Sequence, residues 1–196
     1  MTAGKGFQLL ELVTVLAVLG LVVTLGVPPL LQTTSRQRLH LAAGQITTVL
    51  QQARQTAIRF TSNVGLALEL RPDGDLDLRL YRDGDGDGVH RDDIEQGVDV
   101  ELPFAPALSR PGRAVRPGFP EGPPPRDPGD PTRRLDRLDD PIRFGRSDLA
   151  VFTSLGTATP GTIYLTDGRH LLAVRVLGTT ARIRVLEYDP ETETWN

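Results

Sequence analysis

The sequence contains no cysteine, and its three histidines lie far apart at positions 40, 90 and 170. A chain without cysteine cannot form disulfide bridges, thiolate metal sites or a cysteine nucleophile. Isolated histidines do not supply a metal-binding triplet, and the sequence shows neither a phosphate-binding loop nor a nucleophile elbow. The composition therefore argues against an enzyme, and we expect no catalytic residue.

Charge is missing from residues 12–35, whereas Glu11 lies just inside the front of the same apolar run. The run over residues 7–31 is longer than the about 20 helical residues that cross a bilayer, so it predicts a transmembrane helix. Lys5, the only lysine, precedes the run and predicts a cytoplasmic N-terminus. We therefore expect a single-pass protein of a bacterial inner membrane, with its C-terminal domain in the periplasm.

Glu11 needs an explanation, because a carboxylate that faces lipid is unfavourable and usually has a partner. Cleavage between Gly6 and Phe7 would create an amino group at Phe7, four residues before Glu11. Glu11 of one chain could then neutralise the Phe7 amine of the next chain. A secretory signal peptide is the first alternative, although the run is longer than a usual signal core. The second alternative is a plain membrane anchor, which leaves Glu11 unexplained.

The stretch GFQLLE at residues 6–11 resembles the class III signal of type IV pilins and of type II secretion pseudopilins. The resemblance implies that a prepilin peptidase removes a leader of residues 1–6 by cutting after Gly6. It also implies that Phe7 is N-methylated and that Glu11 guides assembly with other pilins or pseudopilins. Pro28 lies where such helices carry a proline, which predicts a kink or local break.

Apolar residues recur at three- and four-residue steps over residues 32–61, which predicts that the helix continues there as an amphipathic helix. Period-two alternation over 63–70 and 76–81 predicts a hairpin, and a second hairpin is expected around a turn at 177–180. The expected fold class is α+β. In that fold a long N-terminal helix, transmembrane in its first half and amphipathic in its second, packs on an antiparallel β-sheet head.

The predicted head, residues 62–196, contains ten prolines within residues 105–141 and few large apolar residues there. Such a segment buries too little surface to offset the entropy of ordering it. We interpret residues 105–141 as an irregular or disordered surface excursion, with a helical turn near 130–139.

The head resembles the GspH/FimT group of minor pilins. The matching segments are LQQARQTAIR at 50–59, YRDGDGDGV at 81–89, GTIYL at 161–165 and LGTTARIRV at 177–185. The resemblance implies a minor pseudopilin of a type II secretion system, which assembles into or caps a periplasmic pseudopilus for protein secretion. The alternatives are a FimT-kind minor pilin of a type IV pilus, involved in pilus assembly or DNA uptake, and a membrane-anchored domain that never assembles.

Three carboxylates occupy alternate positions of a glycine-rich loop: Asp83, Asp85 and Asp87. Calcium prefers such oxygen ligands. The twelfth position of an EF-hand loop carries an acid, but here it is Ile94, so Asp93 or Glu95 would have to complete the site. The alternative is an Asp-Gly turn with solvated carboxylates. A bound calcium ion would be structural, and no other cofactor is expected.

Arg182 and Arg184 alternate with apolar residues and so project from one face of the last predicted hairpin. In DNA-uptake members of the FimT group a Gly-Arg-x-Arg motif binds DNA, and paired arginines can contact phosphates. Here Ala181 stands at the glycine position, and the acidic residues at 187, 189, 191 and 193 would repel a polyanion. We therefore favour a solvated strand face over DNA binding.

Overall fold

The computed structural model describes residues 9–72, 74–103 and 115–196, without the side chains of residues 10 and 22–33. The predicted leader, with the cleavage and methylation positions Gly6 and Phe7, lies outside the described residues. The chain divides into two compact units, Met1–Gln37 and Arg38–Asn196. Each unit is described by itself.

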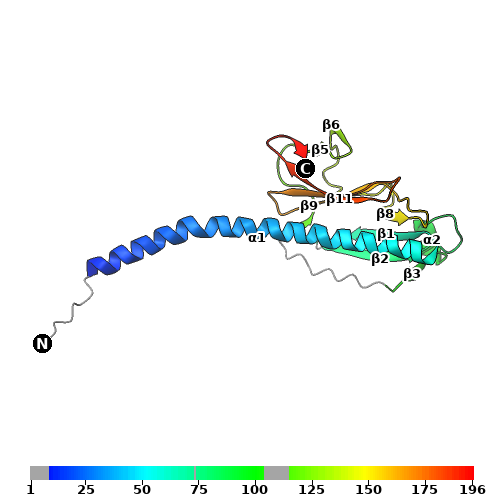
Figure 1. Ribbon diagram of the computed structural model, residues 1–196, viewed down its shortest axis with the longest axis horizontal. Coiled ribbons are helices and arrows are strands. Elements are labelled where there is room, and N and C mark those ends of the chain that lie inside the picture. The colour runs from blue at the N-terminus through cyan, green and yellow to red at the C-terminus, as the bar shows by residue number, and fades with distance from the viewer. Residues whose placement is uncertain (1–8, 73, 104–114) are drawn as a thin grey trace. The chain divides into compact units, whose positions relative to one another are not determined.

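Helix α1 extends from Leu9 to Phe60 and contains 52 residues (Figure 1). It continues through Pro28, so the helix does not break at that proline. In the first unit, every described side chain over residues 9–21 is exposed. In the second unit, one stripe of α1 is buried and contributes to the main hydrophobic core.

The structure corrects the predicted membrane span. In the part of the chain that the structure describes, no helix is both long enough and apolar enough to cross a membrane. The transmembrane first half over residues 7–31, the fold class that contained it and the single-pass placement in the bacterial inner membrane were therefore wrong.

The second unit also differs from the single sheet that we expected, because its strands form three antiparallel sheets. A four-stranded sheet has the order β3-β2-β1-β8, with β1 (Val64–Leu70), β2 (Leu76–Arg82), β3 (Val100–Leu102) and β8 (Leu149–Phe152). The hairpin predicted over residues 63–81 is confirmed as β1 and β2, with Leu70 opposite Leu76. A short helix α2 (Arg91–Gln96), which we did not predict, lies between β2 and β3.

The larger sheet has the order β12-β11-β10-β9-β4, and β7 also pairs with β9. Its strands are β4 (Arg116–Pro117), β7 (Ile142–Arg143), β9 (Gly161–Thr166), β10 (Leu171–Val176), β11 (Ile183–Asp189) and β12 (Thr194–Trp195). The hairpin predicted around residues 177–180 is confirmed as β10 and β11. Side chains from one face of each of the two larger sheets join the buried stripe of α1 in a shared core.

Residues 115–141, called the proline-rich segment below, are more regular than we expected. They include β4 and the two-stranded sheet of β5 (Arg126–Asp127) and β6 (Asp130–Arg134). Strand β6 occupies the position at which we expected a helical turn, so that prediction was wrong. The remaining part of the predicted excursion, residues 105–114, lies outside the described residues.

Candidate functional site

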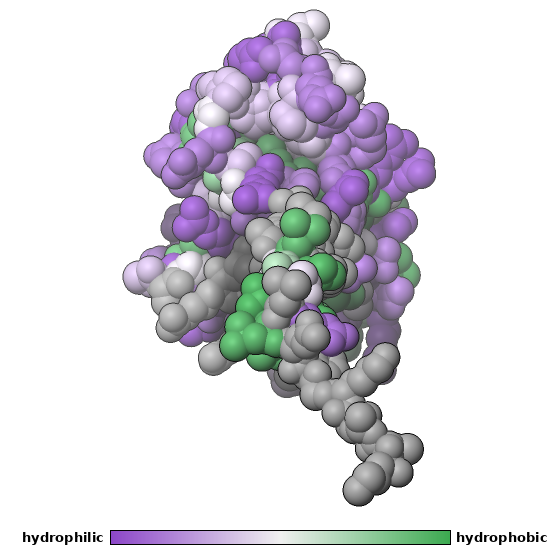
Figure 2. Space-filling view, turned by 90° about the vertical axis from the view of Figure 1, so that its left-hand side faces the viewer, coloured by the Kyte–Doolittle hydropathy of each residue, from purple (hydrophilic) through white to green (hydrophobic). Residues whose placement is uncertain are grey.

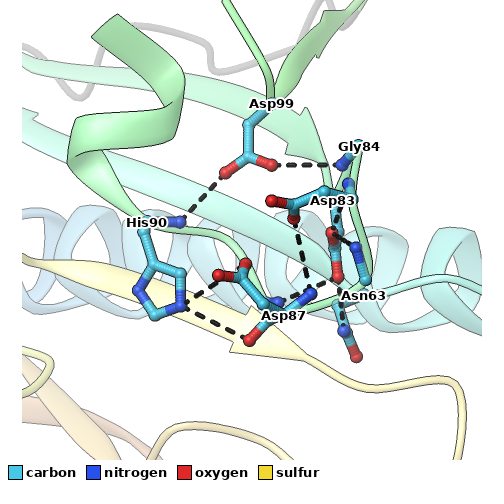
Figure 3. Close-up of polar contacts among 9 residues, drawn as sticks. Asn63, Asp83, Gly84, Asp87, His90 and Asp99 are labelled. Atoms are coloured by element: carbon cyan, nitrogen blue, oxygen red, sulfur yellow. Dashed lines mark hydrogen bonds and ion pairs between the residues drawn. The ribbon is translucent and has the colours of Figure 1, made fainter. Parts of the chain in front are cut away.

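Residues 83–90, called the acidic loop, connect β2 to α2 and contain three of the carboxylates predicted to bind calcium (Figure 3). One ligand oxygen from each of Asp83, Asp85 and Asp87 lies within 4.8 Å of the others. Among the described residues, the group of ligand atoms close enough to share an ion at this loop comprises these three and does not include Asp93 or Glu95. The structure therefore brings together three of the five predicted ligands.

Asp83 is buried and accepts four hydrogen bonds. Its Oδ1 accepts from the N–H groups of Asp85 at 3.2 Å and Gly86 at 2.6 Å. Its Oδ2 accepts from the N–H of Gly88 at 3.0 Å and from Nδ2 of Asn63 at 2.6 Å. A carboxylate offers about four acceptor positions. A cation would therefore compete with these donors for Asp83.

The protonation of Asp83 follows from the same contacts. Burial by itself would raise its pKa, because a charged carboxylate loses solvation. The hydrogen bonds from Asn63, Gly86, Gly88 and Asp85 outweigh burial and hold the pKa of Asp83 below its usual range. Asp83 is thus a carboxylate at neutral pH and stabilises the conformation of the loop.

Asp99 is a second buried carboxylate, which the sequence analysis missed. Its Oδ1 accepts from the N–H of Gly84 at 3.1 Å, and its Oδ2 accepts from the N–H of His90 at 3.0 Å. A Cβ at Gly84 would lie 2.0 Å from the carbonyl oxygen of Val98, so only glycine fits there. The sequence contains no signal for this burial, because alternation would place Asp99 on the opposite face from Val98 and Val100. In the structure those valines are the exposed residues, at 37% and 49%, and Asp99 is buried.

Asp85 and Asp87 are exposed, in contrast to Asp83. Desolvation raises the pKa of Asp87, and a hydrogen bond that its neutral carboxyl donates to Asp85 and repulsion by Asp85 and Asp93 act in the same direction. The two carboxylates are therefore crowded, and a hard cation is the kind of ligand that would relieve their repulsion.

Arg182 and Arg184 are both exposed, as the sequence predicted for a solvated face. Arg184 lies on β11 directly opposite Arg175 of β10. The residue before them, Ala181, is buried and has a φ of 47°, in the left-handed region that favours glycine. The backbone at Ala181 therefore has a conformation in which glycine would be less strained than alanine.

Glu11 lies in the first turn of α1 and is exposed. Its backbone carbonyl accepts a hydrogen bond from Oγ1 of Thr14 at 2.9 Å. Because Phe7 lies outside the described residues, the predicted pairing of Glu11 with the Phe7 amine stays a prediction.

Comparison of the chain with family models, with curated proteins and with solved structures gives no match. The resemblance to pilins thus rests on the motifs in the sequence. The roles of Gly6, Phe7 and Glu11, the calcium ligands and the arginine pair remain predictions.

Proposed function

We propose that this chain is a minor pseudopilin of a type II secretion system, a subunit that assembles with other pseudopilins into a filament or caps one. The observation that carries the proposal is the exposed apolar surface at the start of α1. Eight large apolar side chains there are 46% to 79% exposed: Leu9, Leu12, Val13, Val15, Leu16, Val18, Leu19 and Leu21. Figure 2 shows hydrophobic side chains on this end of the molecule in green.

Such a surface favours association. Burial of apolar surface contributes about 25 cal/mol per Å², and a helix that is apolar on all sides normally lies among other apolar elements. Contiguous exposed apolar patches of this kind mark interaction sites. Helices of the same type on neighbouring subunits are suitable partners, because each of them has an exposed apolar surface that the other can bury.

Glu11 would determine the stagger between the α1 helices of neighbouring subunits. A carboxylate that enters an apolar helix bundle must be paired, since an unpaired buried charge is strongly destabilising. Prepilin peptidase cleavage after Gly6 would create the matching cation, the amine of Phe7, on the adjacent subunit. The acid is therefore tolerated only in the assembled state and selects the stagger between helices.

Processing tests the first half of this proposal. Mass spectrometry of the protein purified from cells that express a prepilin peptidase should show an N-terminus at Phe7 carrying one additional methyl group. A protein from cells without the peptidase should retain Met1 and is the control. An N-terminus at Met1 in both, or cleavage well after Gly6, would contradict the proposal.

Glu11→Gln tests the second half. We expect the variant to be processed normally but to lose incorporation into filaments, because the neutral amide cannot pair with the Phe7 amine. Glu95→Gln, on α2, is the matched control and should assemble like the unchanged chain. Incorporation can be measured by cross-linking single-cysteine variants, since the chain has no cysteine of its own. Equal cross-linking of Glu11→Gln and the control would refute the register role.

A FimT-kind minor pilin that binds DNA is the second candidate. The exposure of Arg182 and Arg184, after an alanine in a glycine-like conformation, favours it. This candidate requires a salt-dependent mobility shift of DNA that is lost in Arg182→Ala/Arg184→Ala. Arg133→Ala, an exposed arginine of β6, is the control. The acidic residues that follow on β11 and in the turn before β12 disfavour a polyanion, so the pseudopilin remains our preferred function.

A further inference from the structure

Three Asp-Gly steps follow one another in the acidic loop, beginning at Asp83, Asp85 and Asp87. We propose that Asp85 and Asp87 are sites of spontaneous aspartate isomerisation that stay unreactive because the Asp83 carboxylate binds the attacking backbone nitrogens of Gly86 and Gly88. The reaction is intramolecular and needs no ligand. The inference is independent of the proposed function.

The chemistry at an Asp-Gly step is a cyclisation followed by hydrolysis. The backbone nitrogen of the glycine loses its proton and attacks the carboxyl carbon of the aspartate side chain. A C–N bond forms, a carboxyl C–O bond breaks, and the proton and hydroxyl leave as one water molecule. The resulting succinimide takes up one water molecule at either carbonyl and opens to aspartate or to isoaspartate. Glycine favours the reaction, because it has no Cβ to hinder the approach.

The structure places both attacking nitrogens on one carboxylate (Figure 3). The N–H of Gly86 donates to Oδ1 of Asp83 at 2.6 Å, and the N–H of Gly88 donates to Oδ2 at 3.0 Å. Each bond fixes the orientation of its peptide group, so the nitrogen cannot turn toward the preceding side chain. The negative charge of Asp83 also opposes deprotonation of these nitrogens.

The carboxylate that does this is itself well held. Asp83 is 7% exposed, and Nδ2 of Asn63 donates to it at 2.6 Å from the start of β1. Asp83 is therefore held in place by a residue outside the three Asp-Gly steps.

The Asp-Gly steps at Asp83 and Asp167 serve as internal references, because their glycine nitrogens donate to acceptors other than Asp83. The nitrogen of Gly84, which would attack Asp83, donates to Oδ1 of Asp99 at 3.1 Å. In the larger sheet, the nitrogen of Gly168, which would attack Asp167, donates to the hydroxyl of Thr166 at 2.9 Å. A different substitution can therefore remove the protecting hydrogen bond at each step and allow isomerisation there.

The test is to incubate the full chain and measure isoaspartate at each step by peptide mapping. In Asp83→Ala, isoaspartate at positions 85 and 87 should rise at least about tenfold over the unchanged chain, the factor that corresponds to one lost charge-assisted hydrogen bond. The Asp167 step should not change. Asp83→Ala/Asp85→Glu should react at position 87 alone, because glutamate would have to form a less favourable six-membered ring.

Two further variants keep the inference testable if Asp83→Ala folds poorly. Asp99→Ala should raise isoaspartate formation at Asp83 first, and Thr166→Val should raise it at Asp167 alone. The inference is overturned if the unchanged chain already isomerises at positions 85 and 87 as fast as Asp83→Ala. It is also overturned if each variant raises isoaspartate equally at all the Asp-Gly steps, because protection would then come from the fold as a whole.

Discussion

The two larger sheets each have one face toward α1 and a second face covered by a different segment. On the four-stranded sheet this second face packs with the acidic loop and α2 through Ala67, Tyr81, Val89, Leu149, Ile94 and Val151. On the larger sheet it packs with the proline-rich segment and the C-terminal residues through Leu135, Tyr164, Leu171, Ala173, Phe119 and Trp195. The acidic loop is rich in Gly and Asp and the proline-rich segment in Pro, Gly and Asp. Both are therefore rich in turn-forming residues, yet they are ordered by different interactions.

The acidic loop is ordered mainly by buried charge. Asp83 and Asp99 accept hydrogen bonds from the backbone N–H groups of five loop residues, and Val89 contributes the small apolar contact. The proline-rich segment is ordered by aromatic packing, with 4.8 Å between the ring centroids of Phe119 and Tyr164. Composition alone therefore does not decide whether a turn-rich segment is ordered; the decisive factor is what its backbone and side chains bind.

The C-terminal residues complete the second arrangement. Nε1 of Trp195 donates to the carbonyl oxygen of Arg126 at 2.7 Å. Glu193 forms ion pairs with Arg126, at 3.0 Å, and with Arg134. These contacts join both strands of the β5–β6 sheet to the end of the chain. They lie at the surface, where ion pairs are weaker and more sensitive to salt than buried ones.

The largest effect should come from Asp83→Ala. The substitution leaves the amide of Asn63 and three backbone N–H groups without their acceptor, so we expect a loss of about 3–5 kcal/mol in the free energy of unfolding. Asp85→Ala, an exposed change in the same loop, should stay within about 0.5 kcal/mol. Denaturant unfolding of both variants measures the difference. Equal losses would mean that the loop is not ordered by the buried carboxylate.

Leu135→Ala should have the next largest effect. Leu135 is 4% exposed in the aromatic cluster, and removal of its side chain should cost about 2–3 kcal/mol through lost burial and a residual cavity. Hydrogen exchange should rise over residues 126–135 and stay unchanged in the acidic loop. Leu155→Ala, at a side chain that is 91% exposed, is the control and should have little effect. A loss of protection in both segments would show that the two coverings are not independent.

Salt should separate the two arrangements with a smaller effect, whereas acid should not separate them. The pKa of Asp83 is lowered by folding from an ordinary value of 3.8, so its contribution is present above that value and is lost as the pH falls through the folded pKa. The pKa of Glu193 is lowered as well, through Arg134 and Arg126, so acid should loosen both segments. About 1 M salt, which reduces the Debye length to about 3 Å, should loosen only the proline-rich segment. Hydrogen exchange of the two segments in salt at neutral pH is the measurement, and an equal response would refute the distinction.

The strands of the fold could be predicted because large apolar residues alternate along them: Val64, Leu66 and Leu68 of β1 and Leu78 and Leu80 of β2 all belong to the main core. The burial of the intervening residues Ala67 and Tyr81 was not predictable, because the acidic loop and α2 cover the second face of the sheet. Helix α2 was missed although its end carried a signal, Gly97, which has the left-handed conformation of a helix C-cap at a φ of 75°. The order of the proline-rich segment was not predictable from its own composition. Its partners are remote in sequence: Trp195 lies 69 residues after Arg126.

The same distinction applies to the candidate site. The clustering of Asp83, Asp85 and Asp87 follows from their spacing in a tight loop, so the sequence could predict it. Which of the three carboxylates is buried and which are exposed was not predictable, because this depends on Asn63, 20 residues earlier, and on Asp99. Local spacing thus indicates which side chains meet, whereas partners from other elements decide which of them is buried and which is exposed.

Calcium should have the smallest effect on stability among the changes that distinguish the acidic loop from the proline-rich segment. The donors around Asp83 leave mainly Asp85 and Asp87 for a cation, so we expect binding no tighter than about 1 mM, the weak end of protein calcium sites. At about 1 mM calcium the stabilisation would be about 0.4 kcal/mol, or a rise of about 1–2 °C in the midpoint of thermal unfolding. Asp85→Asn/Asp87→Asn should abolish that rise, and magnesium is the control cation. A rise above about 5 °C would mean that Asp83 exchanges its N–H donors for the ion, and that the acidic loop, unlike the proline-rich segment, is completed by a ligand.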